Sequence, residues 1–423
     1  MNLCFENKTI DFSIDAPASK SIAHRELIVR FLCGDRANLS PEQSDNEDIL
    51  ATKACLSALD KAIRNASEEK NTEDVILFCN ESGSTLRFMI PVAAAFLLGS
   101  HRLTGVREII FETKGRLFDR PVKELQDALF PHGITIRKEE STRRILVSGS
   151  MTPGEYTIDG SVSSQYISGL LMALPLLDAP STICIFNELK SVHYLKLTED
   201  ALSKYDNPVC LKENVYSVDA PGYRKFPSKE LNVEGDWSNG AFLLCLKLFS
   251  DITVNNLNYS SRQGDIAILD FLKQTDGIDY HNGPAVKETT VNCNDTPDIA
   301  PYMACVAPFF FEKTVLSGIG RLRIKESDRV KAVREQLDAF HVKTEESEDT
   351  LIIYGSSYYP RNGESAESFG SSPVVLSSYH DHRMAMCAVL LGVIHRKNVE
   401  IDDINCLNKS FPEFISVIET CFS

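Results

Sequence analysis

The amino-acid sequence lacks the long apolar runs that membrane proteins carry. None of its apolar stretches reaches the roughly 18 residues that a membrane helix requires, and the longest, at 88–98 and 167–177, are interrupted by proline or glycine. The first residues also lack the basic and then apolar pattern of a secretory signal. We therefore expect a cytoplasmic protein that has no membrane partner.

Paired cysteines, common cofactor motifs and an excess of positive charge are also missing. The twelve cysteines, from Cys4 to Cys421, form no C-x-x-C pair, which indicates reduced thiols rather than disulfides or structural zinc. No H-E-x-x-H or G-x-x-x-x-G-K-[ST] motif occurs. The formal net charge of −15 argues against nucleic acid as a partner, because binding to a phosphate backbone requires a basic field.

The chain is long and its structural patterns alternate. Its 423 residues are enough for two domains with substantial cores, and a hydrophobic content of 43% is typical of globular proteins. Strand-like and helix-like patterns follow one another from end to end without a low-complexity tract or a visible short repeat. This alternation predicts an α/β or α+β protein.

Basic residues gather at predicted helix starts, and the segment 325–329 (K-E-S-D-R) is the clearest case. We expect a strand at 322–324, then a tight turn, then an amphipathic helix capped by Ser327. The cations at both ends of the segment would favour an anion at the helix start. Glu326 lies between them, either as a salt-bridge partner or as an acid/base group beside a bound anion.

Five more clusters of this kind precede helix-like runs. They are P-A-S-K-S at 17–21, N-E-S-G-S-T at 80–85, S-V-S-S-Q at 161–165, H-D-H-R at 380–383 and N-K-S at 408–410. Each alone is more often an ordinary helix cap than a site. In an acidic chain, however, six such helix starts suggest one or two ligands that carry several negative groups.

Taken together and in this order, the clusters resemble the 5-enolpyruvylshikimate-3-phosphate synthases. The resemblance runs from Pro17 to Phe414. Its motifs are P-A-S-K-S-I-A-H-R at 17–25, E-S-G-S-T-L-R-F at 81–88, D-R-P at 119–121, D-G-S-V-S-S-Q at 159–165, E-G-D-W-S at 234–238, Q-G-D at 263–265, P-D-I-A at 297–300, K-E-S-D-R at 325–329, D-H-R-M-A-M at 381–386 and N-K-S-F-P at 408–412.

This resemblance implies a function and a fold. The family transfers the enolpyruvyl group of phosphoenolpyruvate to the 5-hydroxyl of shikimate 3-phosphate and releases phosphate, in the shikimate pathway of aromatic amino-acid biosynthesis. No metal or organic cofactor is expected, and we expect a monomer. The implied fold is α/β, with two similar domains of repeated βαβαββ units arranged as inside-out barrels. By resemblance, residues 1–16 plus 235–423 form one domain, residues 17–234 form the other, and the active site lies in the cleft between them.

The resemblance also assigns roles to residues of this chain. Asp298 resembles the proton acceptor, Glu326 resembles the proton donor to the methylene carbon, and Lys20 would lie between the two substrates. The implied shikimate 3-phosphate contacts are Lys20, Ser21, Arg25, Ser163, Ser164, Gln165, Ser191, Tyr194, Asp298 and Lys325. The implied phosphoenolpyruvate contacts are Lys20, Gly83, Arg120, Gln165, Arg329, His382, Arg383 and Lys409.

Some positions depart from the family pattern. Ala18 replaces a commoner Gly, and Val192-His193 replaces a Lys-Pro pair before Tyr194. Glu81 replaces an Asn beside the phosphoenolpyruvate site, where a carboxylate would repel the ligand unless a cation pairs with it. Arg321 stands where Asn often contacts the shikimate phosphate, so Glu81 and Arg321 are left out of the expected contacts.

Two other functions remain open at this point. The first is the sister enolpyruvyl transfer to UDP-N-acetylglucosamine. Members of that family usually carry Lys-Asn at the first motif and a Cys-bearing loop before Arg120, whereas Ser21 follows Lys20 here and the loop at 114–119 has no Cys. The second is a non-catalytic anion-binding relative, for which loss of Asp298 or Glu326 would be the mark, and both are present.

Overall fold

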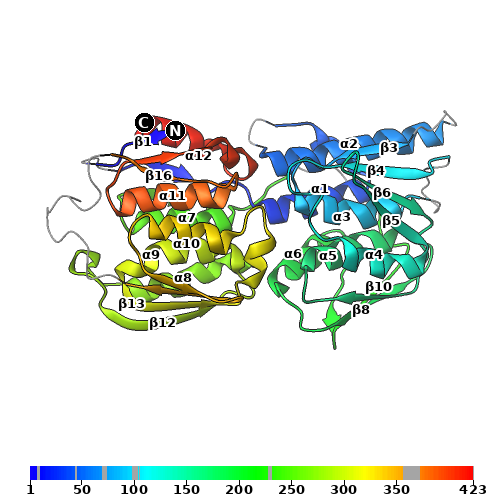
Figure 1. The fold of residues 1–423 in the computed structure, drawn as a ribbon. Coiled ribbons are helices and arrows are strands. Elements are labelled where there is room, and N and C mark those ends of the chain that lie inside the picture. The colour runs from blue at the N-terminus through cyan, green and yellow to red at the C-terminus, as the bar shows by residue number, and fades with distance from the viewer. Residues whose placement is uncertain are drawn as a thin grey trace. The chain divides into compact units, whose positions relative to one another are not determined.

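The structure is a computed structural model that describes residues 1–6, 10–42, 45–68, 74–97, 103, 105–226, 231–355 and 372–422. The chain divides into two compact units. Met1–Ala18 and Glu234–Ser423 form unit 1, and Ser19–Val233 form unit 2. Figure 1 labels the elements of each unit along the chain.

Unit 2 contains the same strand–helix–strand–helix–strand–strand order twice. The first copy comprises β3 (Val75–Phe78), α3 (Gly83–Ala94), β4 (Glu108–Glu112), α4 (Lys123–Leu129), β5 (Ile134–Glu139) and β6 (Arg144–Gly149). The second comprises β7 (Glu155–Asp159), α5 (Ser164–Ala173), β8 (Ser181–Phe186), α6 (Val192–Ser203), β9 (Leu211–Lys212) and β10 (Val215–Val218). The sheets have the orders β3-β4-β6-β5 and β7-β8-β10-β9, in which the first two strands pair in parallel and the others antiparallel. Two further helices of this unit, α1 (Lys20–Leu32) and α2 (Glu47–Ser67), precede both copies.

Unit 1 contains this order again and joins both ends of the chain. The repeated elements are β12 (Val286–Asn292), α9 (Ala300–Val306), β13 (Phe311–Ser317), α10 (Arg329–Asp338), β14 (Thr344–Glu346) and β15 (Thr350–Tyr354), in a sheet of order β12-β13-β15-β14. The N-terminal strands β1 (Asn2–Leu3) and β2 (Ser13–Asp15) pair with β17 (Val399–Ile401) and β11 (Thr253–Asn255), and β16 (Val374–Leu376) pairs with β17. The remaining helices are α7 (Trp237–Lys247), α8 (Ile268–Leu272), α11 (His382–Ile394) and α12 (Pro412–Cys421).

Short 3-10 helices connect many of these elements. Their bounds are Ala37–Leu39, Phe130–His132, Leu174–Leu176, Gly264–Ala267, Lys273–Thr275, Tyr280–Asn282, Pro297–Ile299, Ala307–Phe309, Gly320–Ile324 and Asn405–Lys409. One of them corrects the sequence analysis, because the expected strand at 322–324 belongs to Gly320–Ile324. The cap of α10 is also Asp328, whose side chain accepts from Lys331 N, and not Ser327.

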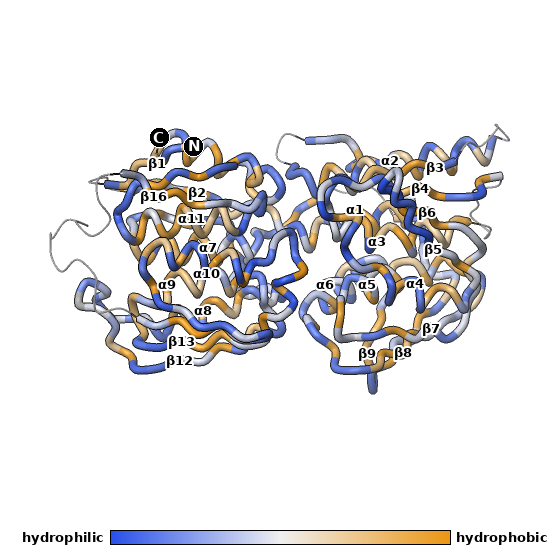
Figure 2. The backbone as a smooth tube through the Cα atoms, viewed as in Figure 1, coloured by the Kyte–Doolittle hydropathy of each residue, from blue (hydrophilic) through white to orange (hydrophobic). Residues whose placement is uncertain are grey.

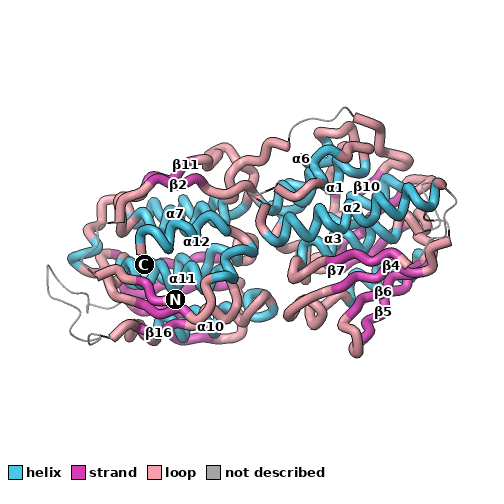
Figure 3. The backbone as a smooth tube through the Cα atoms, turned by 90° about the horizontal axis from the view of Figure 1, so that it is seen from above, coloured by secondary structure: helices cyan, strands magenta, loops and turns pink. Residues whose placement is uncertain are grey.

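The most apolar helices lie inside the units, where strands and other helices cover them. All thirteen residues of α11 are buried, and α3 and α5 are buried on nearly every side. A helix that is apolar all round is stable only when it is enclosed. In Figure 2 the orange of hydrophobic residues runs along these helices through the middle of each unit. Seen from above, helices and strands form separate layers within a unit (Figure 3).

The close contact between α3 and α5 depends on one glycine. A Cβ added to Gly169 of α5 would lie 2.7 Å from the main-chain oxygen of Arg87 and 2.7 Å from Pro91 Cγ, both on α3. Because no side chain separates the two helices at this point, their backbones approach closely near the middle of both. This contact brings residues of the 81–88 and 159–165 motifs together.

Three general findings concern the cysteines, possible metal ligands and possible membrane helices. All twelve cysteines remain thiols in the structure. Within the described ranges, no group of three or more His, Cys, Asp or Glu side chains is placed to hold a metal ion. None of the helices that the structure describes is both long enough and apolar enough to cross a membrane.

Candidate active site

Arg25 of unit 2 is a buried cation that has neutral neighbours. Its side chain lies on α1 and is only 2% exposed. Nε donates to Thr198 Oγ1 at 2.7 Å, Nη1 donates to the Ser21 carbonyl oxygen at 2.5 Å, and Nη2 lies 3.4 Å from Ser168 Oγ. Burial lowers the pKa of Arg25. A buried guanidinium that is bound by hydroxyl and carbonyl oxygens keeps its positive charge available for an anionic ligand.

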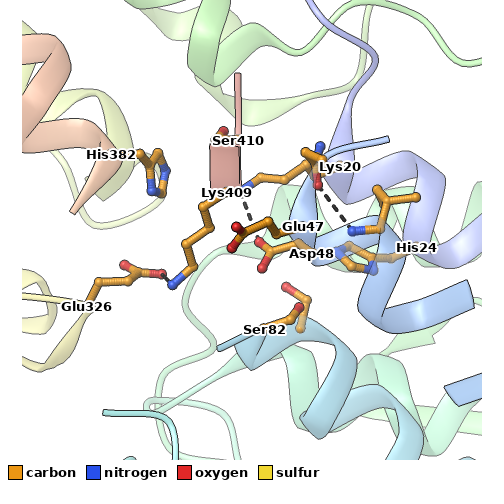
Figure 4. A network of polar contacts seen from close by, with 12 residues as sticks. Lys20, His24, Glu47, Asp48, Ser82, Glu326, His382, Lys409 and Ser410 are labelled. Carbon is orange, nitrogen blue, oxygen red and sulfur yellow. Dashed lines mark hydrogen bonds and ion pairs between the residues drawn. The ribbon is translucent and has the colours of Figure 1, made fainter. Parts of the chain in front are cut away.

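Lys20 is the first residue of α1, and its side chain is held by α2. Lys20 Nζ lies 3.1 Å from Asp48 Oδ2, and the two side chains are 16% and 11% exposed. Figure 4 shows both residues beside the N-terminal turn of α3. Ser19, the residue before Lys20, makes no side-chain cap to α1.

Gly83 opens α3 and leaves room for Arg120. A Cβ on Gly83 would lie 2.4 Å from Arg120 Nη1 and 3.0 Å from Arg120 Cζ, so the missing side chain lets the guanidinium approach the helix start. Ser82 caps α3 through Thr85 N. The combination places a cation beside the positive end of a helix, where an anion is favoured.

Gln165 connects the starts of α5 and α3. Its Oε1 accepts from Arg87 Nη1 at 2.8 Å, and its Nε2 donates to Ser84 Oγ at 2.8 Å. Ser163 caps α5 through Gln165 N, and Ser164 is buried beside it. The amide is therefore fixed in orientation by hydrogen bonds at both of its ends.

The start of α6 supplies Ser191 and Tyr194. Ser191 is buried and has a φ of 56°, a left-handed conformation that is uncommon for a residue with a side chain. Tyr194 N donates to the Ser191 carbonyl oxygen at 3.1 Å. A strained backbone of this kind persists only where the surrounding structure holds it in place.

Unit 1 has its own cluster, which is centred on Arg329. This guanidinium is 2% exposed and contacts three carboxylates among the described side chains. Nε and Nη2 donate to the two oxygens of Asp381 at 2.8 and 3.1 Å, Nη1 donates to Asp298 Oδ1 at 2.8 Å, and Nη2 donates to Glu326 Oε2 at 2.6 Å. Burial opposes the charge of Arg329, but these carboxylates raise its pKa above the usual value. The sequence analysis placed Arg329 at a helix entrance, which is confirmed, because Arg329 is the first residue of α10 and is buried there.

The two carboxylates expected to move protons are both held by cations. Lys325 Nζ lies 3.4 Å from the same Asp298 oxygen that Arg329 contacts. Burial alone would raise the pKa of Asp298, but Lys325, Arg383 and Arg329 hold it below its ordinary value. Glu326 Oε1 lies 3.6 Å from Lys409 Nζ, a contact visible in Figure 4.

Arg383 and His382 open α11 immediately after its cap, Asp381. Arg383 Nη1 donates to the Tyr302 hydroxyl at 2.9 Å and lies 3.4 Å from the Ser238 carbonyl oxygen. The buried His382 ring has its Nδ1 3.8 Å from Asp381 Oδ1. Asp381 is fully buried and also accepts from Ser327 Oγ at 2.9 Å, so Ser327 holds this carboxylate instead of capping α10.

A buried acid that the sequence analysis did not assign lies near Arg383. Asp265 accepts a hydrogen bond from the Ser238 hydroxyl and is 4% exposed. Burial, together with the nearby Asp298 carboxylate, raises the pKa of Asp265 to about 7. Asp265 belongs to the Q-G-D motif at 263–265, which was the available signal.

The structure groups the expected residues by unit. Unit 2 holds Lys20, Ser21, Arg25, Gly83, Arg120, Ser163, Ser164, Gln165, Ser191 and Tyr194, and unit 1 holds Asp298, Lys325, Glu326, Arg329, His382, Arg383 and Lys409. Within these groups, direct contacts join Arg25 to the Ser21 main chain and Arg329 to both Asp298 and Glu326. The residues that the sequence analysis missed include Asp48, Arg87 and Asp381, although the last two lie inside quoted motifs.

Three of the residues that depart from the family pattern make contacts that the structure shows, and nothing in the structure explains Val192-His193. The Glu81 carboxyl packs against Gly115, where an added Cβ would lie 2.1 Å from Glu81 Oε1. Glu81 is thereby turned toward the 114–120 segment. Arg321 donates to the main-chain oxygen of Asn294. Ala18 forms a bridge with Gly235.

Comparisons with known proteins agree on one family. The family model for EPSP synthase (3-phosphoshikimate 1-carboxyvinyltransferase) matches residues 6–418. The 3-phosphoshikimate 1-carboxyvinyltransferase of Clostridioides difficile strain 630 is 31% identical over 427 residues, which cover 95% of this chain and 93% of that protein. The protein of the same name from Clostridium novyi strain NT is 33% identical over 427 residues and has the same coverage.

A solved structure supports the fold. The EPSP synthase of Acinetobacter baumannii at 2.37 Å has a TM-score of 0.70 and 18% identity, with 100% of this chain and 98% of that chain covered. The α/β fold of repeated units is thus shared with that enzyme. The family match also favours transfer to shikimate 3-phosphate over transfer to a nucleotide sugar. The chain therefore belongs to the EPSP synthase family, which transfers the enolpyruvyl group in the shikimate pathway.

Proposed function

We propose that the charged clusters of the two units act together on phosphoenolpyruvate and shikimate 3-phosphate. The observation that carries this proposal is the Arg329 guanidinium, which lies 2.8 Å from Asp298 and 2.6 Å from Glu326. The expected base and the expected acid are therefore neighbours of one cation. A cation in this place can bind an anionic substrate between the two proton-transfer groups.

In this proposal each substrate has its own set of contacts. Shikimate 3-phosphate is bound by Lys20, Ser21, Arg25, Ser163, Ser164, Gln165, Ser191, Tyr194, Asp298 and Lys325. Phosphoenolpyruvate is bound by Lys20, Gly83, Arg120, Gln165, Arg329, His382, Arg383 and Lys409. Arg25 supports the first set because its described partners are neutral oxygens. Arg120 supports the second set because it lies against the start of α3.

The proposed reaction begins with addition across the double bond of phosphoenolpyruvate. The 5-hydroxyl oxygen of shikimate 3-phosphate attacks C2, Asp298 takes the hydroxyl proton, and Glu326 gives a proton to the methylene carbon C3. The product of this step is a tetrahedral intermediate. In the second step a proton leaves C3, the C2–C3 double bond forms again, and phosphate departs. The chemistry is proton transfer with addition and elimination, so the proposal includes no metal or organic cofactor.

The charges around the two carboxylates suggest how binding prepares them. A pKa below the ordinary value keeps Asp298 ionised, as a base must be, but its cations also weaken its basicity. Glu326 contacts Arg329 and Lys409, which stabilise a carboxylate, whereas a proton donor must be protonated. In our proposal, the phosphate and carboxylate groups of the substrates take over these cations, so that Asp298 becomes a stronger base and Glu326 takes up the proton that it must donate.

We further propose that the enzyme acts as a cytoplasmic monomer and has no nucleic-acid or membrane partner. The net charge of −15 fits small anionic substrates bound at local basic clusters better than it fits a nucleic acid.

The test of the acid role uses Glu326→Gln, with Glu335→Gln as the matched control. Glu335 lies on the same unit in α10 and makes a surface contact with Lys331 at 3.8 Å. We expect Glu326→Gln to lower turnover by at least about a hundredfold, the usual scale for a proton-transfer group. In D2O it should also stop deuterium entering the methylene group, whereas the control should match the parent protein. Near-parental turnover in Glu326→Gln would remove Glu326 from the mechanism.

A further inference from the structure

Asp48, which none of the expected contacts includes, joins two helices that carry proposed site residues. Its carboxylate Oδ2 accepts from Lys20 Nζ of α1 at 3.1 Å. Its main-chain oxygen accepts from Thr85 Oγ1 of α3 at 3.3 Å. Thr85 follows Gly83 by two positions in the first turn of α3. One residue of α2 therefore contacts the first turns of both neighbouring helices.

A buried chain of hydrogen bonds fixes Asp48 within this arrangement. Thr85 Oγ1 lies 2.8 Å from Ser82 Oγ and 2.7 Å from Thr52 Oγ1. Thr52 Oγ1 in turn lies 2.7 Å from His24 Nδ1. These four side chains are at most 1% exposed, so breaking the chain would leave polar groups without water.

The four side chains of this hydrogen-bond network carry no net charge. Burial lowers the pKa of His24 to about 3, although the nearby Asp48 carboxylate acts in the opposite direction. The ring is therefore neutral at neutral pH, and the Lys20 ammonium is a charged group that faces Asp48 here. Figure 4 shows Lys20, His24, Asp48 and Ser82 around this point.

The Asp48 carboxylate has the right surroundings to hold a lysine. It lies in the first turn of the 21-residue helix α2, where the helix dipole favours a negative charge. The Asp48 and Lys20 side chains are 11% and 16% exposed, so salt screens this pair less than it would screen a surface pair. A lysine side chain is long and flexible, and an ammonium that acts on reacting atoms must be held in place.

We propose that Asp48 is a positioning residue that holds the Lys20 ammonium in its reactive place and aligns it with the start of α3. This inference rests on the role of Lys20 in the proposed function. Asp48 acts through Lys20 and does not touch the substrates. The opposing explanation is that the ion pair only stabilises the fold.

Asp60 offers a matched control on the same helix. It is 5% exposed and pairs with Arg36 at 2.5 Å and with Arg64, far from the proposed contacts in sequence. We expect Asp48→Asn to lower kcat and kcat/KM together by about tenfold to a hundredfold, because a misplaced group loses transition-state contacts. Asp60→Asn should lower the melting temperature and leave kcat unchanged. Asp48→Glu, which keeps the charge, should recover part of the lost turnover.

The Lys20→Met background separates this inference from the proposed function. If Asp48 acts through Lys20, Asp48→Asn should cause no further loss of turnover when added to Lys20→Met. Parental turnover in Lys20→Met alone would overturn the role of Lys20 and this inference with it. If Lys20→Met loses turnover while Asp48→Asn keeps it, the role of Lys20 stands and only the positioning role of Asp48 is overturned. An equal effect of Asp48→Asn in both backgrounds would also overturn it, because Asp48 would then act independently of Lys20.

Discussion

Replacing Gly83 with Ala should weaken phosphoenolpyruvate binding while leaving the fold intact. The new Cβ would lie 2.4 Å from Arg120 Nη1, whereas ordinary contacts begin at about 3.4 Å, so the guanidinium must move by about 1 Å. Arg87 Nη1, at 3.3 Å from the same Cβ, limits the direction of that movement. The backbone itself accepts alanine, because no positive φ is present at Gly83. The less flexible unfolded chain favours the variant by about 0.4–1 kcal/mol, which offsets part of the cost of moving Arg120.

The expected loss follows from the contact that Arg120 is proposed to make. A hydrogen bond to a charged group contributes about 1.5–3 kcal/mol, which corresponds to about a 10- to 150-fold rise in KM for phosphoenolpyruvate. Because the contact is made in the ground state as well, kcat should change much less. The assay is steady-state phosphate release with each substrate varied in turn, alongside thermal unfolding.

A double-mutant cycle tests the reasoning directly. If the alanine acts by displacing Arg120, adding Gly83→Ala to Arg120→Ala should raise KM no further. The reasoning is refuted if Gly83→Ala leaves KM for phosphoenolpyruvate at the parental value, or if its effect is unchanged when Arg120 is absent.

Three further predictions follow from buried ionisable groups. Arg25→Met should raise the dissociation constant of shikimate 3-phosphate by at least about tenfold, because it removes a buried cation whose described partners are neutral. Calorimetric titration measures this constant, and a parental value would contradict the prediction. The pKa of Asp265 is raised from 3.8 to about 7 in the folded protein, so the ionised carboxylate favours the unfolded state as pH rises above 3.8. Asp265→Asn removes this carboxylate and should stabilise the protein above pH 7, with little effect below pH 3.8. Urea unfolding at pH 4 and pH 8 checks that sign, and a variant less stable than the parent at pH 8 would contradict it. His395 stacks on Phe340 at 4.3 Å, and burial lowers its pKa from 6.5 to about 3. The free energy of unfolding should therefore decrease as pH falls from 6.5 toward 3, by up to about 1.4 kcal/mol per pH unit. His395→Phe should flatten that part of the stability profile, and an unchanged slope would exclude this histidine as a cause.

The sequence predicted local structure best where the spacing of apolar residues along the chain determines it. The helix-like run expected after the cluster at 80–85 is a helix, and its apolar positions Leu86, Met89 and Ile90 are buried. The pattern did not reveal that α3 is enclosed on nearly every side, because enclosure depends on which elements pack around it. The segment 322–324 was assigned wrongly as a strand, since three alternating residues fit a 3-10 helix equally well.

The repeats and the charged clusters could not be derived from spacing. The three βαβαββ copies share strand order, but burial requires only apolar residues at the right positions and no repeated letters. Arg329 meets Asp298 and Asp381 from segments that lie 31 and 52 positions away, and only the tertiary fold brings them together. The ordered motifs were enough to identify the family, whereas the pairing of Lys20 with Asp48 is visible only in the tertiary structure. The expected substrate contacts and domain boundaries stay predictions.

Phosphate release from phosphoenolpyruvate, measured with and without shikimate 3-phosphate and without added metal, tests the central claim most directly. We predict release only when shikimate 3-phosphate is present. No release despite measurable binding of shikimate 3-phosphate, or release that requires UDP-N-acetylglucosamine instead, would contradict the proposed reaction.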